Sequence, residues 1–230
     1  MAFNTKRIVR AVQRRLGITP PKQPLSPMSY GTLARFLYFK RLYDKIAGLE
    51  GHVVECGVGK GRSLLLLSTL VSEEGKRRHI WGFDSFEGFP EPSEQDDSPR
   101  QPQKGDWSNT SIARVMTYLK NSDVDPRFVD SQITLIKGFF NETLMQYRDE
   151  PIAFLHLDCD LYDSYKDSLT LLYDKVVPGG VICFDEYMKT GQLVAFPGAA
   201  RAIDEFFGAR RGAIERDAAS GQYFYIKPAP

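Results

Sequence analysis

Two pairs of acidic side chains are candidates for a functional site. Asp158 and Asp160 follow one apolar segment, and Asp185 and Glu186 follow the next. If both segments are parallel strands, their carboxyl ends meet at the same edge of a sheet. Four neighbouring carboxylates repel one another unless a cation joins them. An all-oxygen ligand set suits Mg²⁺, Mn²⁺ or Ca²⁺ better than zinc, so we interpret the cluster as a divalent-metal site.

The local conformation around the first pair decides how its side chains point. An extended chain places Asp158 and Asp160 on one face, ~7 Å apart. The alternative is that Asp160 or Asp163 caps the helix that follows. A capping role accounts for one acidic residue but not for four, and we therefore favour the metal site.

A glycine-rich segment predicts a place where a ligand can approach the backbone. Gly57-Val58-Gly59-Lys60-Gly61 follows an apolar run and leads into a helix beginning near Ser63. Glycines permit close approach, and a helix N-terminus offers free N–H groups. The GxGxG spacing departs from the dinucleotide fingerprint GxGxxG, which disfavours a nicotinamide cofactor. Asp84 ends the next apolar run and can accept both hydroxyls of a ribose, although a turn or capping role is the alternative.

Apolar runs alternate with helical patterns along the chain, and this alternation positions the polar groups. We expect strands over 53–57, 80–84, 132–138, 152–158, 181–185 and 223–226, and helices over 30–47, 63–71, 164–176 and 201–207. Such alternation predicts a doubly wound α/β fold with a mostly parallel sheet and helices on both faces. His156 lies inside a continuously apolar strand, so we interpret it as a core residue.

Length and composition indicate one globular domain. The chain has 230 residues, of which 42% are hydrophobic, and no apolar run reaches the ~18–20 residues of a membrane span. Its first residues lack the apolar core of a secretion signal. Cys56, Cys159 and Cys183 lie in or directly after predicted buried strands, and buried free thiols suit a reducing compartment. We therefore expect a cytoplasmic protein.

The charge is distributed unevenly. Nine basic residues precede the first acidic residue, Asp44. Ile8, Val12 and Leu16 form an apolar stripe among these bases, which predicts a basic amphipathic helix. We expect residues 1–47 to form a basic N-terminal helical arm and residues 48–230 to form the main domain. The arm either docks on its own body or on a partner subunit, which we favour, or rests on an anionic membrane surface.

The acidic body of the chain argues against nucleic acid as a partner. We expect a homodimer. A long segment over 90–111 is rich in Pro, Gln, Asp and Ser. A loop of that length usually acts as a lid or a binding loop, and a loose surface excursion is the alternative.

Four segments resemble the macrocin O-methyltransferase (TylF-type) family: Val54–Ser63, Phe83–Pro90, Leu157–Tyr162 and Pro178–Tyr187. The resemblance extends from about Met28 to Phe207. It implies a Rossmann-like class I methyltransferase fold, dependence on S-adenosylmethionine and Mg²⁺ (or Mn²⁺), and methylation of a sugar hydroxyl on a glycosylated natural product or a polysaccharide.

The resemblance also assigns roles to individual residues. The implied cofactor-binding residues are Met28, with Ser29 beside it, Glu55, Gly57, Gly59, Ser63, Asp84, Ser85, Phe86 and Asp158. The implied metal ligands are Asp158, Asp185 and Glu186, and Asp160 matches the family's general base. Two positions depart from the family pattern: Glu186 replaces an aspartate, and Gly59 with Arg62 replaces an aromatic residue and a glycine.

Other functions remain open at this point. We expect an acceptor with vicinal hydroxyls, and a catechol or another phenol meets that description as a sugar does. A nicotinamide oxidoreductase is disfavoured by the glycine spacing. A non-enzymatic alternative is a cofactor-binding partner of a glycan-assembly complex, recruited to a membrane by the basic arm.

Overall fold

The computed structural model describes residues 29–147, 150–188 and 194–229 of the chain. The chain divides into two compact units, residues 1–34 and 35–230. The apolar stripe predicted at Ile8, Val12 and Leu16 and the cofactor candidate Met28 lie outside the described residues. The domain boundary predicted after residue 47 stays a prediction.

The described elements follow one another as strands and helices. The strands are β1 (His52–Cys56), β2 (Ile80–Asp84), β3 (Ile133–Lys137), β4 (Ile152–Leu157), β5 (Val176–Phe184), β6 (Glu215–Arg216) and β7 (Tyr223–Ile226). The α-helices are α2 (Tyr30–Lys45), α3 (Arg62–Glu74), α4 (Ile112–Asn121), α5 (Pro126–Gln132), α6 (Phe140–Thr143), α7 (Tyr162–Leu172) and α9 (Pro197–Phe207). The short 3₁₀ turns are η1 (Glu94–Asp96), η2 (Leu144–Gln146), η3 (Tyr173–Lys175) and η4 (Gly208–Ala213).

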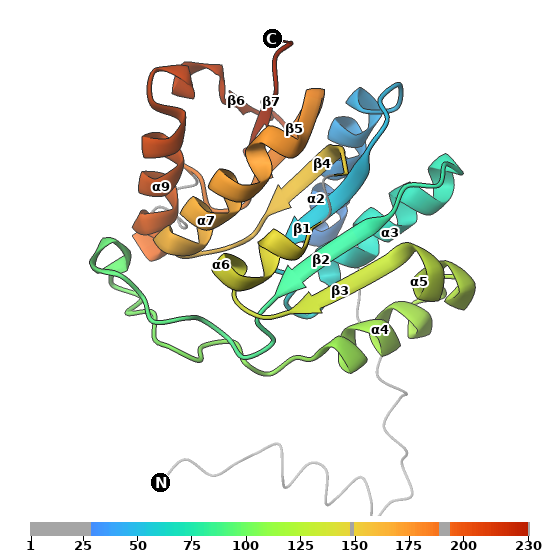
Figure 1. Ribbon diagram of the computed structural model, residues 1–230, viewed down its shortest axis with the longest axis horizontal. Coiled ribbons are helices and arrows are strands. Elements are labelled where there is room, and N and C mark those ends of the chain that lie inside the picture. Colours follow the sequence, from blue (N-terminus) through green and yellow to red (C-terminus); the bar gives the residue numbers. More distant parts are fainter. Residues whose placement is uncertain (1–28, 148–149, 189–193, 230) are drawn as a thin grey trace, which may run out of the picture. The chain divides into compact units, whose positions relative to one another are not determined.

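The strands form one seven-stranded sheet in the order β3-β2-β1-β4-β5-β7-β6 (Figure 1). β1 to β5 pair in parallel, whereas β7 runs antiparallel to both β5 and β6. Strand order reverses between β1 and β4, which is where doubly wound sheets bind ligands at the carboxyl edge. The predicted mostly parallel α/β fold is confirmed.

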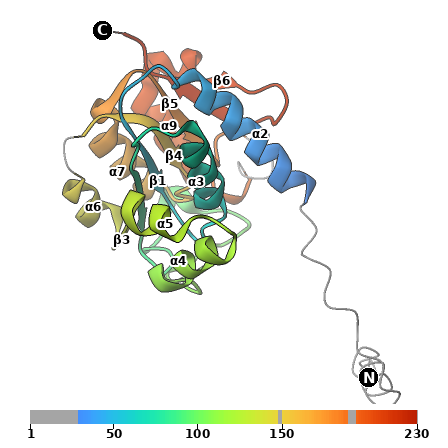
Figure 2. The same cartoon turned by 90° about the vertical axis from the view of Figure 1, so that its right-hand side faces the viewer.

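Alternating side chains of the central strands supply two separate cores. Val54 of β1 faces a cluster that includes α7 and α9, whereas Val53 faces a cluster that includes α2, α3, α4 and α5. Figure 2 shows α3 with the carboxyl half of α2 on the second face. The helices cover both faces of the sheet, so β4 is buried at every residue, as the near-continuous apolar runs of the sequence predicted.

Strands β5 and β6 differ from the sequence prediction. β5 begins at Val176 rather than at Val181, because the glycines after Pro178 lie within the strand at a register irregularity opposite β4. The Gly179 amide donates to the Lys227 carbonyl at 2.7 Å, so this stretch is paired. β6 contains two exposed residues, too few for a period-2 pattern to be recognised.

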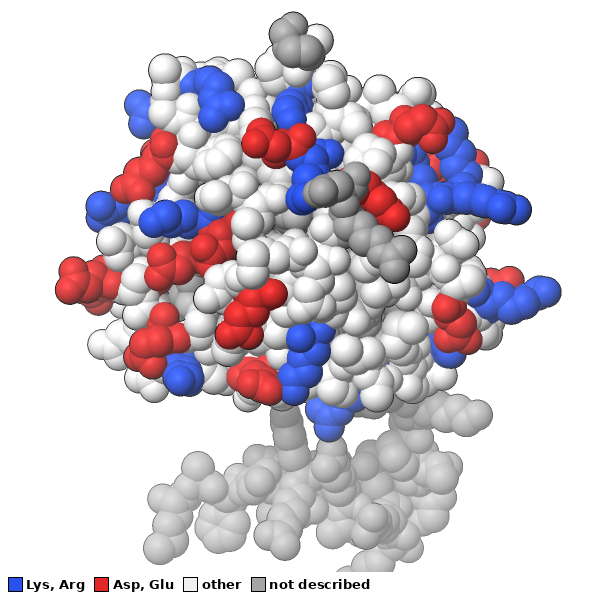
Figure 3. Space-filling model, viewed as in Figure 1, with Lys and Arg blue, Asp and Glu red and all other residues white. Residues whose placement is uncertain are grey.

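The surface carries charges of both signs. Figure 3 shows acidic and basic side chains interspersed over the face in view. Among the described residues, no helix is both long enough and apolar enough to span a bilayer.

Candidate active site

A cavity of about 710 Å³ opens at the carboxyl ends of the parallel strands. Its wall combines the glycine loop after β1, the long segment after β2, residues 138–142 after β3 and the start of α7. Seven of the predicted site residues line it: Gly57, Gly59, Ser63, Asp84, Ser85, Asp158 and Asp160. These residues are distant in sequence, and they lie together because each is near the carboxyl end of a parallel strand, where such sheets bind ligands.

The two glycines at the start of the loop have different reasons to be glycine. Gly57 has a φ of 89°, and a Cβ there would lie 1.8 Å from the Asp158 carbonyl oxygen. Gly59 has a φ of 52°, yet a Cβ there would meet no atom within 4 Å. Gly57 thus permits close packing of β1 against the end of β4, and Gly59 leaves open space beside the cavity.

Asp84 joins the glycine loop to the turn after β2. Its Oδ2 accepts from the Gly59 amide at 2.8 Å, and its Oδ1 accepts from the Phe86 amide at 2.6 Å. Burial raises the pKa of the Asp84 carboxyl, and the two amides oppose this rise. The turn role proposed as the alternative is therefore present. Each carboxylate oxygen keeps a further lone pair that a ligand could use, and the turn role therefore does not exclude ribose binding. Ribose binding stays a prediction.

The carboxylates of the acidic cluster lie close together as predicted, but the backbone conformation that brings them together differs from the expected one. Carboxylate oxygens of Asp158, Asp160 and Glu186 lie within 4.8 Å of one another. β4 ends at Leu157, and Asp160 has a φ of 61°, in the left-handed region. The premise of an extended chain through Asp160 is therefore wrong, because a turn brings its side chain back toward Asp158.

Burial and mutual repulsion set the charge of this cluster. The pKa of each of these three carboxyls is raised, first by burial and then by neighbouring carboxylates, Asp185 among them. A divalent cation would relieve that repulsion, because it offers two positive charges to several buried oxygens.

Glu186 contains an unsatisfied oxygen. Its Oε2 accepts from the Tyr165 hydroxyl at 2.5 Å, whereas its buried Oε1 has no hydrogen-bond partner. A buried carboxylate oxygen without a partner is costly, and a divalent cation is one partner that would satisfy it. The donor set of this cluster therefore fits a divalent metal.

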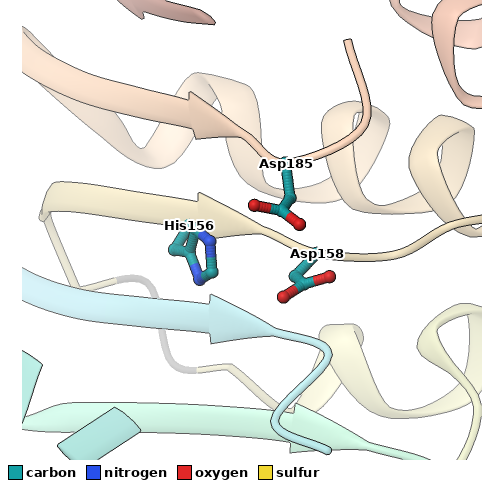
Figure 4. A group of neighbouring side chains, drawn as sticks. All are labelled: His156, Asp158 and Asp185. Atoms are coloured by element: carbon teal, nitrogen blue, oxygen red, sulfur yellow. The ribbon is translucent and has the colours of Figure 1, made fainter. Parts of the chain in front are cut away.

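Asp185 occupies the other side of Asp158. Figure 4 shows Asp158 and Asp185 just beyond the ends of their strands, with His156 on β4. Ligand atoms of these three residues also lie within 4.8 Å of one another. The predicted metal ligands are thus divided between two groups that share Asp158. Arg35 donates to Asp185 and lies 3.6 Å from Asp158 Oδ2.

Neither aspartate weighed as a helix cap takes that role. α7 has Leu161 at its N-cap position and no capping side chain of its own. Instead, Asp96 Oδ1 accepts from the Tyr162 amide at 2.8 Å. The capping group comes from the long segment after β2, which leaves Asp160 free to face the cavity.

Glu55 and His156 form a buried pair. His156 Nδ1 lies 2.9 Å from Glu55 Oε1, and both side chains are almost fully buried. Burial raises the pKa of Glu55 and lowers the pKa of His156 to about 3. His156 is therefore the core residue that the sequence indicated. Glu55 lies outside the cavity wall, as do Phe86, Asp185 and Glu186, and its cofactor role stays a prediction.

The segment over 90–111 is packed against the body. Phe89 exchanges backbone hydrogen bonds with Gly105 and Asp106, and Ser98 donates to the Ala195 carbonyl. Thr110 donates to the Gly59 carbonyl at 2.7 Å. A loose surface excursion is therefore the wrong description, whereas movement as a lid stays a prediction.

An arginine at the centre of three aromatic rings was missed by the sequence analysis. The Arg100 guanidinium lies 4.7 Å from the Trp107 ring centroid, 5.2 Å from Phe89 and 5.0 Å from Phe196. Arg100 also donates to Asp106 at 2.9 Å. Trp107 lines the cavity and is 55% exposed. The partners of Arg100 come from three separate segments of the chain, so no local sequence pattern could reveal this cluster.

Comparison with known proteins places this architecture among methyltransferases. A demethyldecarbamoylnovobiocin O-methyltransferase from Streptomyces niveus is 30% identical over 159 residues, 69% of this chain and 58% of the relative. A mycinamicin III 3''-O-methyltransferase from Micromonospora griseorubida is 28% identical over 69% of this chain and 61% of the relative. The chain thus spans about three-fifths of the length of these curated relatives.

Solved structures share the fold. The O-methyltransferase NovP superimposes with a TM-score of 0.71 and 25% identity, covering 86% of this chain and 81% of NovP. The calicheamicin methyltransferase CalS11 superimposes with a TM-score of 0.76 and 21% identity, covering 98% of this chain and 93% of CalS11. The family model described as Macrocin-O-methyltransferase (TylF) matches residues 4–214. The chain therefore belongs to the macrocin O-methyltransferase (TylF) family, as its motifs indicated.

Proposed function

We propose that this protein is an O-methyltransferase that uses S-adenosylmethionine and a divalent metal, Mg²⁺ or Mn²⁺, to methylate a sugar hydroxyl. The acceptor is a glycosylated natural product or a polysaccharide with vicinal hydroxyls. The observation that carries the proposal is the cavity in which the glycine loop and Asp84 share a wall with Asp158 and Asp160.

The cofactor part rests on the glycine loop and Asp84. The open space beside Gly59 gives room for a ligand against the backbone. Asp84 stands at the end of β2, where a carboxylate can accept from ribose hydroxyls. Ser85 and Gly138 lie in the same wall, and we assign this end of the cavity to the nucleoside.

The metal part rests on the acidic cluster. Asp158, Asp185 and Glu186 would hold the ion, and the unsatisfied Glu186 Oε1 is the observation that favours it. Bound S-adenosylmethionine supplies the methyl group, and a bound divalent cation lowers the pKa of the acceptor hydroxyl.

Asp160 is our candidate for the general base. Its side chain lies in the cavity wall, and its pKa is raised, chiefly by burial, which makes its ionised carboxylate a stronger base. Asp160 takes the hydroxyl proton as the oxygen forms its bond to the methyl carbon and the sulfur–methyl bond breaks, with S-adenosylhomocysteine as the leaving group. The cavity must hold the oxygen in line with the sulfur–methyl bond, and rigid walls serve that alignment.

The sugar part rests on the relatives, since one of them, from Streptomyces olivaceus, is named as the 4'-O-methyltransferase of a rhamnosyl tetracenomycin. A panel of acceptors tests it: glycosides with vicinal hydroxyls, simple alcohols and catechols, each with labelled S-adenosylmethionine and with Mg²⁺ or EDTA. We expect methyl transfer to vicinal sugar hydroxyls in Mg²⁺ and its loss in EDTA. Methyl transfer to catechols alone would show that the acceptor is a phenol rather than a sugar. Equal turnover in Mg²⁺ and in EDTA would show that the reaction needs no divalent metal.

A further inference from the structure

Arg35 places a fixed positive charge on the acidic cluster. It lies on α2, lines the cavity and keeps 28% of its side chain exposed. Its Nη2 donates to Asp185 Oδ1 and lies 3.6 Å from Asp158 Oδ2. One nitrogen of the guanidinium therefore contacts both carboxylates at once, which is the position that a bridging cation takes.

The surroundings of the guanidinium keep it in this position. Its central carbon lies 5.8 Å from the centre of the Phe39 ring. Burial alone would lower the pKa of Arg35, but the charges of Asp185 and Asp158 raise it above its ordinary value. Arg35 remains charged at every working pH, so it cannot leave the pair by losing its proton.

A second cation at the same oxygens meets a direct conflict. A divalent ion and a guanidinium about 4 Å apart repel each other, because both are positively charged and are partly shielded from water. The oxygens that face Arg35 are also lone-pair donors of the proposed metal ligands. The two cations can share the pair only if the guanidinium moves.

We propose that Arg35 is a resident counter-cation that competes with the divalent metal for Asp158 and Asp185. Metal entry displaces the guanidinium from the pair, and metal loss lets it return. Arg35 thereby weakens metal affinity and stabilises the two carboxylates while no metal is bound. This inference rests on the proposed function in so far as the cluster takes a divalent cation.

A different role for the same residue predicts the opposite sign. If Arg35 stays in place and donates to carboxylates that hold the metal, removing it weakens metal binding. If Arg35 competes, removing it strengthens metal binding. The sign of the change in metal affinity therefore separates competition from support.

Direct titration with Mn²⁺, monitored by the loss of the free-ion EPR signal, measures the sign of the change in metal affinity without any turnover. The proteins are the wild type, Arg35→Met, which keeps much of the length without the charge, and Arg35→Lys. Arg41→Met is the matched control, because Arg41 lies on the same helix as Arg35 but pairs with Asp217 and is absent from the cavity wall. Melting temperatures in EDTA show that each variant is folded.

We expect Arg35→Met to bind Mn²⁺ about tenfold more tightly than the wild type, which corresponds to ~1.4 kcal/mol. Arg35→Lys should lie close to the wild type, and Arg41→Met should equal it. In EDTA, Arg35→Met should melt at a lower temperature than the wild type and regain the difference in Mn²⁺.

Two results overturn the inference in distinguishable ways. If the wild type binds Mn²⁺ and Arg35→Met binds it equally or more weakly, competition is wrong and the proposed metal site stands. If the wild type and both Arg35 variants bind no Mn²⁺, the metal part of the proposed function fails together with this inference.

Discussion

Asp160 combines a left-handed backbone with a buried side chain, and this combination makes it the most informative residue of the site. Asp158 is placed by the end of β4, but Asp160 reaches the cavity only through its φ of 61°. Non-glycine residues in that region are uncommon and often mark functional sites. The same conformation frees its amide to lie 3.4 Å from Glu186 Oε2.

Asp160→Asn should abolish proton acceptance while keeping the size of the side chain. We expect kcat to fall by about 10²- to 10⁴-fold, with little change in the affinity for S-adenosylhomocysteine. Single-turnover methyl transfer and calorimetry measure the two quantities. Asp130→Asn, at an exposed aspartate paired with Lys120, is the matched control. A kcat within twofold of the wild type would remove Asp160 from the mechanism.

Asp84→Asn tests the nucleoside end of the cavity. The amide group of asparagine has one oxygen to accept with, so one of the bonds from the Gly59 and Phe86 amides is lost and ribose recognition weakens. We expect the Kd of S-adenosylhomocysteine to rise about tenfold or more, from hydrogen bonds worth ~1–2 kcal/mol. Mn²⁺ affinity should stay unchanged. An unchanged cofactor Kd would show that Asp84 serves the turn alone.

At the scale of elements, the segment over 90–111 depends on Arg100. Its guanidinium packs against the rings of Phe89, Trp107 and Phe196, of which Phe89 and Trp107 line the cavity, and cation–π contacts contribute up to ~2 kcal/mol where water is excluded. The Asp96 bond to the first turn of α7 fixes the other end of the segment. The segment therefore links the cavity mouth to the helix that follows the acidic cluster.

Arg100→Leu should loosen the segment without changing the nucleoside end. We expect faster proteolytic cleavage within 90–111 and an acceptor KM raised about tenfold, while the Kd of S-adenosylhomocysteine stays constant. Arg127→Leu provides the control, because Arg127 is 94% exposed. Unaltered proteolysis together with an unaltered KM would show that the aromatic rings hold the segment without the arginine.

Much of this architecture follows from local sequence patterns. Runs such as 152–157 are apolar because both faces of the sheet are covered, so the strands and the acids at their ends could be predicted. The contacts of Arg35 and the contact of Arg100 with Phe196 could not, because these partners are distant in sequence: Asp185 is 150 residues away from Arg35. The left-handed turn at Asp160 was also missed, since aspartate at that position is equally compatible with an extended chain.

At the scale of the whole molecule, the acidic cluster couples stability to pH and to metal. The folded protein raises the pKa of Asp158, Asp160 and Glu186, chiefly by burial. Above about pH 4, the ordinary carboxyl pKa, the folded state therefore holds protons that the unfolded chain releases. The cluster's contribution to the free energy of unfolding then falls as pH rises.

Thermal unfolding at several pH values tests this coupling. We expect Mg²⁺ to raise the melting temperature more at pH 8 than at pH 5, because metal binding requires deprotonated carboxylates. At a concentration of 100 times the Kd, binding contributes about 2.7 kcal/mol, or roughly 5–10 °C for a chain of this size. Glu186→Gln should remove most of the Mg²⁺ effect. A larger Mg²⁺ effect at pH 5 would contradict the assignment of the cluster.

The central claim is that the cavity at the carboxyl edge of the sheet binds the methyl donor. Calorimetric titration of S-adenosylmethionine and S-adenosylhomocysteine tests it most directly, with NAD as the competing dinucleotide and with Mg²⁺ or EDTA present. We predict that both sulfur compounds bind at one site per chain in either condition and that NAD does not bind. Binding of NAD without either sulfur compound would contradict the account and assign the glycine loop to a different chemistry.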